Sequence, residues 1–314
     1  MAPVQNTTKR KLAEGNLVLG FLVHHLRTVA VPLLAAASDH DFLFIDTEHG
    51  AFSLQEATQL CLAALPTGIT PLVRVCAGAL DEATRLLDNG ALGIVVPHVD
   101  TAKQARHIAE AFHYPPAGRR SWGSPPPAYL YLPPADVAEA QAAINAEILT
   151  VVMIETAEAV ENAADIAAVD GIDVLLIGSF DLTTDLGVPG RMDHPKLVAA
   201  YEAVAHACHK HGKVLGMGGV NGQGDQARYV GLGARFVTNA SDHAYVLEGA
   251  RARSGVLRGI AREAGIGAPP AEITVEGPAG LTAEARAAEV PMAEAPADRG
   301  KKARKEKRRQ RSEG

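Results

Sequence analysis

Eight short apolar runs recur along the first ~250 residues of the chain, and segments with helical periodicity lie between them. Continuous apolar runs of this kind are typical of strands buried on both faces, as in a parallel sheet. Eight such strands alternating with helices predict a (β/α)8 TIM barrel. A doubly wound open sheet is the alternative, but no GxGxxG follows the first run, which disfavours a dinucleotide site. The eight runs are residues 17–23, 42–46, 71–76, 92–97, 149–155, 173–178, 213–217 and 235–238.

Some of the intervening helices carry start signals. Ser53 with Glu56, and Thr101 with Gln104, have the spacing of a capping box. In this motif the side chain of each residue accepts a hydrogen bond from the backbone N–H of the other. Asp81 is expected to cap the helix that follows the third run. Further helices are expected over residues 7–14, 195–211 and 243–262.

The stretch FLFIDTEHG, residues 42–50, changes abruptly from apolar to charged. Asp46, Glu48 and His49 emerge where the second strand leaves the core. In parallel α/β folds the carboxyl ends of the strands carry the chemistry, so this stretch predicts a site. A plainer interpretation also holds at this point, in which Asp46 caps the next helix and His49 is a loop histidine.

Four more polar residues fall at or just past strand ends, and in a barrel they converge on the same face. They are Arg74, His98, Glu155 and Asp181. Glu155 and Asp181 have no Cys or HxxxH pair nearby, and oxygen donors with several waters suit Mg2+ or Mn2+, with Co2+ also possible. Each carboxylate taken alone could instead be a helix cap.

Arg74 interrupts an otherwise apolar strand, so its charge must be paired. The partner is either Asp46 or Glu48, or an anionic substrate. His49 is the expected proton-transfer group because the unperturbed histidine pKa lies near neutrality. Asp46 or Glu48 could fix its tautomer, and Glu48 and His98 are expected to support the site.

Residues 114–134 interrupt the alternation with seven prolines in 21 residues, together with Arg119, Arg120, Trp122 and Gly123. Proline density of this kind excludes a helix or a central strand. A loop this long is typically functional or disordered.

Charge is distributed unevenly. Nine of the 30 Lys and Arg residues, but only three of the 36 acidic ones, follow Ala297, so the preceding chain carries a formal charge of −12. An acidic body disfavours nucleic-acid binding, and only the basic tail could contact a polyanion, weakly. Residues 1–265 are expected to form the barrel. Residues 266–314, rich in Ala, Pro and Glu and then basic, are expected to be a disordered extension.

The three cysteines, Cys61, Cys76 and Cys208, are widely spaced and form no CxxC pair. This favours a reducing compartment and argues against a disulfide framework or a thiolate metal site. The N-terminus lacks a signal-peptide core and no later stretch has 18 unbroken apolar residues. We therefore expect a cytoplasmic protein without membrane contact.

Six motifs, taken in order, resemble the HpcH/HpaI aldolase family, in the branch related to macrophomate synthase. They are FxxIDTEHG, the strand with Arg74, VVPHVDTAKQA, YPPAGRRSWG, MIETAEAVEN and IGSFDLTTDLGVPG. The resemblance runs from about residue 16 to 250. It implies a (β/α)8 barrel, commonly a hexamer built as a trimer of dimers that exchange the last helix.

The resemblance also implies roles for individual residues. Glu155 and Asp181 hold a divalent metal, Arg74 binds the keto-acid group, and His49 works with Asp46 in water-mediated proton transfer. Substrate contacts are expected from four further residues, Gly178, Ser179, Phe180 and Arg120. Three departures concern the acceptor more than the metal: Phe180 replaces a small residue, Met153 stands where some members have glutamine, and Ser121 replaces a common glycine.

Together these features predict a metal-dependent carbon–carbon lyase that acts on a small 2-keto acid through a pyruvate enolate. The reaction would be retro-aldol cleavage of a 4-hydroxy-2-keto acid, decarboxylation of oxaloacetate, or both. No lysine stands at a comparable strand end, which argues against a Schiff-base aldolase. Two alternatives are a citrate-lyase-type enzyme acting on acyl-CoA esters, with Arg119 and Arg120 as the phosphate contacts, and an inactive barrel that serves as an interaction scaffold.

Overall fold

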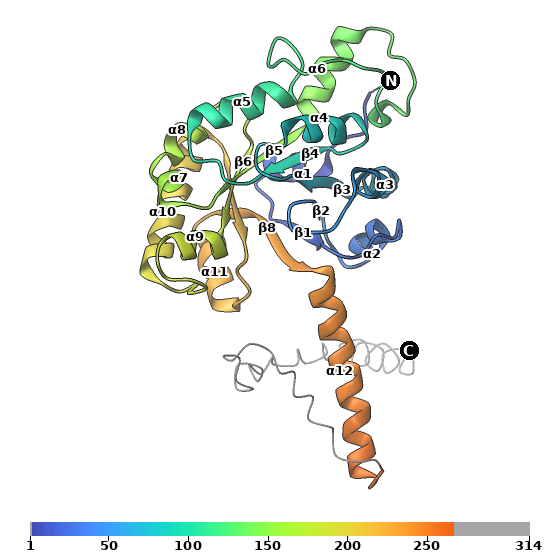
Figure 1. Cartoon of the computed structure of the whole chain (residues 1–314), viewed down its shortest axis with the longest axis vertical. Coiled ribbons are helices and arrows are strands. Elements are labelled where there is room, and N and C mark those ends of the chain that lie inside the picture. Colours follow the sequence, from blue (N-terminus) through green and yellow to red (C-terminus); the bar gives the residue numbers. More distant parts are fainter. Residues whose placement is uncertain (1, 267–314) are drawn as a thin grey trace, which may run out of the picture. The chain divides into compact units, whose positions relative to one another are not determined.

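The computed structural model describes residues 2–266 and contains a closed barrel of eight parallel strands in the order β1 to β8 (Figure 1). The predicted barrel is therefore confirmed, with strand ends within three residues of those predicted. The compact unit that holds it ends at Val256. The predicted extension from residue 267 onward lies outside the described residues. The strands are β1 Val18–Val23, β2 Phe42–Asp46, β3 Thr70–Arg74, β4 Gly93–Val96, β5 Leu149–Ile154, β6 Val174–Gly178, β7 Val214–Gly218 and β8 Ala234–Ser241.

Helices connect successive strands and surround the barrel in Figure 1. Four helices were not predicted from the sequence: α2 and α9, of seven residues each, α11, of nine, and α6, of eleven. Two short helices, α7 and α8, occupy the segment after β5 and meet at Asn162. The helices are α1 Thr7–Ala13, α2 Val31–Ala37, α3 Leu54–Ala64, α4 Leu80–Asp88, α5 Ala102–Phe112, α6 Val137–Glu147, α7 Ala157–Glu161, α8 Ala163–Ala167, α9 Ser179–Asp185, α10 Pro195–His211, α11 Gln223–Gly231 and α12 Asp242–Glu263, with 3₁₀ turns at Leu65–Thr67 and Pro127–Tyr129.

The helix starts follow local capping chemistry. Both predicted capping boxes, at the starts of α3 and α5, are present with reciprocal hydrogen bonds. The prediction for Asp81 is wrong, because α4 begins one residue earlier and its N-cap is Ala79, with no side-chain cap. Asp81 instead lies in the first turn, where its charge favours the positive end of the helix dipole.

Alternation along the strands divides the core in two. Phe42, Phe44 and Phe236 belong to the cluster inside the barrel, whereas Leu43 and Ile45 pack against the helices. Because successive strand side chains point to opposite faces, every second residue of a strand faces the interior. Phe42 and Phe236 stack there with ring centroids 4.4 Å apart. Strand β2 is buried at all five positions, as its apolar run predicts.

The N-terminal helix α1 covers the amino ends of the strands. Thr8 donates its hydroxyl to the carbonyl of Asp41, Asn6 donates its side-chain amide to the carbonyl of Leu92, and Leu12 joins the interior cluster. These contacts close one end of the barrel. The carboxyl end is thus left for a site.

The proline-rich segment after α5 is ordered and packs at the amino end of the barrel. Val4, in the N-terminal segment, donates its backbone N–H to the carbonyl of Ala128. The side-chain amide of Asn145 accepts the backbone N–H of Tyr114 through its oxygen and donates to the Tyr114 carbonyl through its nitrogen. Tyr114 and Tyr129 are buried. The disordered alternative for this loop is therefore wrong, and the expectation of a segment without helix is corrected by one 3₁₀ turn.

The helices between residues 2 and 266 include none with the length and apolar character needed to cross a lipid bilayer.

Candidate active site at the carboxyl end of the barrel

The interior-facing stripes of several strands end in polar residues. On β2 the stripe Phe42 and Phe44 continues to Asp46, and on β3 Leu72 is followed by Arg74. On β5 the stripe of Leu149, Val151 and Met153 continues to Glu155. Because the period-2 alternation carries through, these charged groups form the last layer of the barrel interior. The strand-end residues predicted from the sequence thus share one face.

Asp46 and Arg74 form a two-pronged ion pair at the centre of this layer. They are register partners on β2 and β3. Arg74 Nε lies 2.9 Å from Asp46 Oδ1, and Nη2 lies 2.5 Å from Oδ2. Asp46 is fully buried, and Arg74 is nine-tenths buried. The expected pairing of the buried arginine is therefore present.

Asp46 is held in the ionised form. Its Oδ1 also accepts the backbone N–H groups of Glu48 and His49, at 3.1 and 3.3 Å. Burial alone would raise the pKa of Asp46, but the contacts with His24 and Arg74 outweigh it and hold that pKa well below its ordinary value of 3.8. Asp46 is thus an ionised acceptor, and the interpretation of Asp46 as a simple helix cap does not hold.

His24 is a site residue that the sequence reading missed. It follows the last residue of β1, and its Nε2 lies 3.0 Å from Asp46 Oδ2. The signal was present in the same alternation: Val18 and Leu22 belong to the interior cluster or pack on it, and Gly20 faces Phe42, so position 24 falls on the interior stripe.

Of the two carboxylates predicted to orient His49, Glu48 is the one nearest to its ring. Its side chain is 65% exposed and its Nε2 is 3.7 Å from Glu48 Oε2. Asp46 bonds the backbone N–H of His49, whereas the imidazole next to Asp46 is that of His24. His49 therefore stands at the rim, with Glu48 as its nearest carboxylate.

Glu48, expected to play a supporting part, bridges the site. One of its oxygens lies 3.4 Å from Arg74 Nε and the other lies 3.9 Å from His98 Nε2. His98, the second residue expected in support, turns toward Glu155. Its backbone is in the left-handed region with φ of 54°, and its N–H donates to Glu155 Oε2 at 2.9 Å. The His98 ring Nδ1 is 3.3 Å from the same oxygen.

Glu155 is a buried carboxylate whose negative charge is offset mainly by its contacts with His98. Burial raises the pKa of Glu155, the His98 contacts oppose that rise, and the charges of Asp181 and Glu48 add to it. A β-carbon at Gly178 would lie 2.5 Å from Glu155 Oε1, so glycine is required there to make room for the carboxylate. Asp181 stands exposed in the first turn of α9.

These carboxylates fit a divalent cation. Between residues 2 and 266 no three or more His, Cys, Asp or Glu side chains form a ready-made ligand cage. Mg2+ and Mn2+ do not need one, since they commonly take one or two carboxylates and complete their shell with substrate and water. Burial chiefly raises the pKa of Glu155 and the charges of Asp181 and Glu48 add to it, and a bound cation would stabilise the ionised form.

Three residues expected to contact substrate differ in their placement. Phe180 is 54% exposed and its ring covers Gly219, at the end of β7, so it lies at the rim. Gly178 adjoins Glu155. The Ser179 hydroxyl instead points into the core, where it meets the hydroxyl of Tyr201 at 2.8 Å.

Arg120 is not brought to the site. Its Nη2 lies 2.6 Å from Asp88 at the end of α4, and its guanidinium sits over the ring of Tyr114 at 4.6 Å. The chain around it is bonded to the C-terminal turn of α5, at the opposite end of the barrel from the strand carboxyl ends. Arg119 pairs with the exposed Glu110. Neither arginine supplies a phosphate contact at the barrel mouth, so the basis offered for an acyl-CoA substrate is removed.

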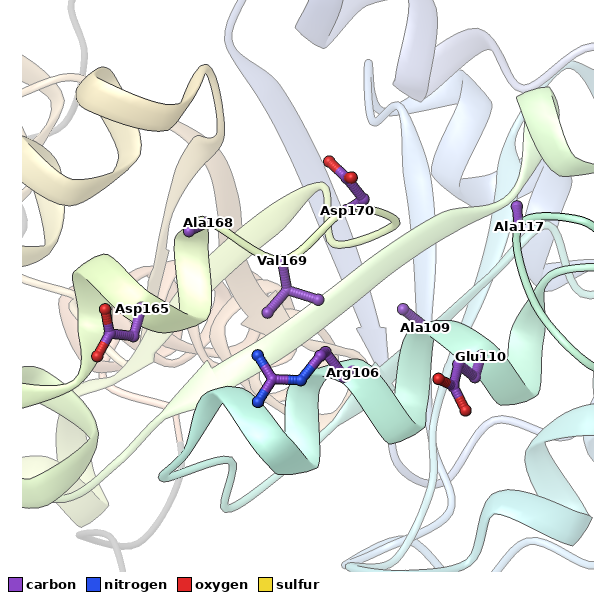
Figure 2. Close-up of a pocket in the computed structure, with 8 residues that line it drawn as sticks. All are labelled: Arg106, Ala109, Glu110, Ala117, Asp165, Ala168, Val169 and Asp170. Carbon is purple, nitrogen blue, oxygen red and sulfur yellow. The ribbon is translucent and has the colours of Figure 1, made fainter.

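Figure 2 shows a hollow on the outside of the barrel, where α5 approaches the turn that follows α8. It encloses about 320 Å3 and carries charges of both signs, with Arg106 and Glu110 on α5 opposite Asp165 and Asp170. None of the strand-end residues lines it. Its side chains are therefore useful as controls for the charged residues of the site.

Comparison with known proteins identifies the family of the chain. The profile of the HpcH/HpaI aldolase/citrate lyase family matches residues 30–248. The chain belongs to this family. The resemblance predicted from the six motifs is thereby confirmed, and the chain is a member of an aldolase and lyase enzyme family.

Individual relatives extend over most of the chain. A 4-hydroxy-4-methyl-2-oxoglutarate aldolase of Hapsidospora irregularis is 38% identical over 267 residues, covering 83% of this chain and 97% of its own. The crystal structure of an HpcH/HpaI aldolase from Desulfitobacterium hafniense superposes with a TM-score of 0.74 at 30% identity, covering 80% of this chain and 96% of that one. Macrophomate synthase superposes with a TM-score of 0.69 at 26% identity, covering 83% and 92%.

The ion pair at the centre of the site predicts a pH-dependent loss of stability. In Asp46→Asn the buried Arg74 loses its counter-charge, so the free energy of unfolding at neutral pH should fall by about 3–5 kcal/mol. Because the pKa of Asp46 is lowered in the fold, its contribution is present above the ordinary value of 3.8 and is lost as pH falls below it. The difference between wild type and variant should therefore narrow below pH 3.8.

Denaturant unfolding at neutral pH and below pH 3.8 measures this difference. Asp81→Asn, an exposed carboxylate of α4, is the matched control and should change stability by less than about 0.5 kcal/mol. An Asp46→Asn variant as stable as wild type, or a gap that is constant with pH, would contradict the assignment.

Proposed function

We propose that the chain is a divalent-metal-dependent carbon–carbon lyase that works through a pyruvate enolate. The observation that carries the proposal is the buried Arg74 beside Asp46 on the same interior layer as Glu155, in a chain of the aldolase family. The substrate class is a 4-hydroxy-2-keto acid, cleaved by a retro-aldol reaction, with oxaloacetate decarboxylation as a further reaction. The activity named for the Hapsidospora relative supports this substrate class.

Glu155 and Asp181 would hold the metal, with Mg2+ or Mn2+ preferred and Co2+ also suited to the oxygen donors. When bound, the ion supplies Lewis-acid chemistry that favours negative charge on the keto oxygen. The support lies in the charge balance of the site. Glu155 is buried and its pKa is raised by burial and by the neighbouring carboxylates, so a cation would stabilise its ionised form.

Arg74 would bind the keto-acid group. Its Nε and Nη2 are committed to Asp46, while Nη1 has only the Met153 sulfur, 4.0 Å away, as a contact among the described residues. A guanidinium locked along one edge keeps its remaining donors in a fixed direction. Preorganised donors of this kind stabilise charge that develops in the transition state without reorganisation.

Proton transfer completes the reaction. In the cleavage direction the 4-hydroxyl loses its proton, the bond between C3 and C4 breaks, and its electron pair enters the enolate of pyruvate. The enolate then takes a proton at C3, which yields pyruvate and the aldehyde or ketone. We propose that His49, at the rim, exchanges these protons through water, with Asp46 held ionised beneath it.

The proposal predicts metal-dependent release of pyruvate from oxaloacetate and from a 4-hydroxy-2-keto acid. Chelation with EDTA should abolish it and added Mg2+ or Mn2+ should restore it. Glu155→Gln and Arg74→Met should each lower kcat by about 10²–10³-fold, because the first removes a charged ligand that would hold the metal and the second removes a positive charge beside the developing enolate. Arg74→Lys should also be impaired, since an ammonium cannot form the two-pronged pair with Asp46.

Matched controls come from the hollow of Figure 2. Arg106→Met and Glu110→Gln change the same charges on the outer face and should leave kcat within about twofold. Pyruvate release that is unaffected by EDTA, or unaffected by Glu155→Gln, would reject the metal-assisted mechanism. No release from the intact protein with any of these metals would reject the lyase proposal.

We also propose that the chain is a homo-oligomer, a trimer of dimers, as the family resemblance implies. Helix α12 supports the proposal because it exposes large apolar side chains, each between 48% and 68% accessible: Val246, Leu247, Val256, Leu257 and Ile260. A second copy of the chain would remove this surface from water.

Sedimentation of the full chain tests the assembly. A species of about six chain masses is expected, and Val256→Glu with Leu257→Glu should shift it to smaller species because charges are costly in an apolar interface. A wild-type monomer at all concentrations would contradict the proposal.

A further inference from the structure

The imidazole that contacts the buried carboxylate of the site comes from β1. His24 follows Val23 directly and lies on the interior stripe of the strand. Its Nε2 lies 3.0 Å from Asp46 Oδ2 but is not aligned for a hydrogen bond in this conformation, and its side chain is 24% exposed. A small rotation of the ring would align the Nε2–H with that oxygen. The same oxygen accepts Arg74 Nη2. His24, Asp46 and Arg74 are thus three links of one chain of contacts across β1, β2 and β3.

The backbone at His24 is fixed independently of Asp46. Asp242, at the start of α12, accepts the backbone N–H groups of His24, His25 and Leu26 at 3.2, 2.7 and 2.7 Å. Asp242 is almost fully buried. Its carboxylate therefore holds the turn after β1 in one conformation, from which the His24 side chain reaches Asp46.

Two further imidazoles surround the ring. His24 and His243 stack with centroids 5.6 Å apart and planes 28° apart, and His25 meets His243 edge-on at 5.1 Å. His25 is also a histidine and lies next to His24 in the same loop. Among the described residues, its ring contacts no carboxylate. A substitution of His25 therefore tests the loss of a histidine from this loop without the loss of a contact with Asp46.

We propose that His24 is a positioning residue of the lyase reaction, which donates its Nε2–H to Asp46 and so fixes the carboxylate that orients Arg74. This role rests on the proposed function. Asp46 accepts four hydrogen bonds, two from backbone N–H groups and two from Arg74, and His24 Nε2 is the fifth nitrogen near its two oxygens. Loss of the His24 side chain leaves Oδ2 with Arg74 alone, so the carboxylate can rotate and carry the guanidinium with it.

The residue acts through Arg74 and not on the substrate, which gives it a distinct kinetic signature. The full chain with His24→Leu should lose about 10–100-fold in kcat for pyruvate release, as for other residues that orient a functional group, with KM within about threefold. His24→Gln places a side-chain N–H near the position of Nε2 and should stay within about threefold of wild type in kcat. His25→Leu, the matched control, should do the same.

Three kinetic results would overturn the proposal. They are a His24→Leu variant with wild-type kcat, a His24→Gln variant as impaired as His24→Leu, and a His25→Leu variant that falls equally. Thermal unfolding of each variant accompanies the kinetics. If a variant is unfolded at the assay temperature, its loss of kcat is not evidence for the role of His24. The contact is then tested by NMR of the wild-type protein.

A measurement that needs no turnover separates this proposal from the proposed function. In full-length protein labelled with 15N-histidine, His24 should show the tautomer with hydrogen on Nε2, and its Nε2 resonance should move in Asp46→Asn but not in Glu48→Gln. Hydrogen on Nδ1 alone, or indifference to Asp46→Asn, would reject the pairing. If wild type released no pyruvate, the lyase proposal would fail while this spectrum still decided whether His24 donates to Asp46.

Discussion

The ion pair between Asp46 and Arg74 is the interaction on which the rest of the site depends. A charged arginine inside a barrel costs several kcal/mol unless a carboxylate and further hydrogen bonds compensate it. The strand register supplies that partner, since Asp46 and Arg74 stand side by side at the ends of β2 and β3. The pair also has further contacts: Glu48 lies near Arg74, and both His24 and the backbone after β2 contact Asp46.

The same geometry explains why the site is crowded with negative charge. Interior stripes of β2 and β5 end in Asp46 and Glu155, and Glu48 lies between them, close to both Arg74 and His98. Arg74 balances one of these carboxylates. The surplus negative charge adds to the effect of burial in raising the pKa of Glu155, and it suits the layer to a cation and an anionic keto acid bound together. Gly178 completes the arrangement by leaving room that any side chain would fill.

Most of the fold followed from local signals. Eight apolar runs gave the eight strands because both faces of a barrel strand are buried, and the capping boxes placed the starts of α3 and α5. Asp46, Arg74 and Glu155 were predicted because charge at the end of an apolar run is conspicuous. Short helices such as α2 and α9 carry too few turns to show a period, which is why they were omitted.

The errors at the site come from distances that a linear motif does not contain. Arg120 was predicted as a substrate contact, but its segment lies at the amino end of the barrel and its partner Asp88 belongs to another helix. Ser179 starts a helix whose first turn directs the hydroxyl to Tyr201. His24 lies beside a carboxylate 22 residues away because the parallel register that pairs Val23 with Ile45 continues to His24 and Asp46.

Exchange of the pyruvate methyl protons in D2O tests the central claim, enolate formation at this layer, without any choice of acceptor. Proton NMR of pyruvate with the full chain and Mg2+ or Mn2+ should show loss of the methyl signal as deuterium enters C3. EDTA and Arg74→Met should each suppress the loss, and Arg106→Met should not. If pyruvate binds in the presence of the metal and its methyl protons do not exchange, the site does not form the enolate.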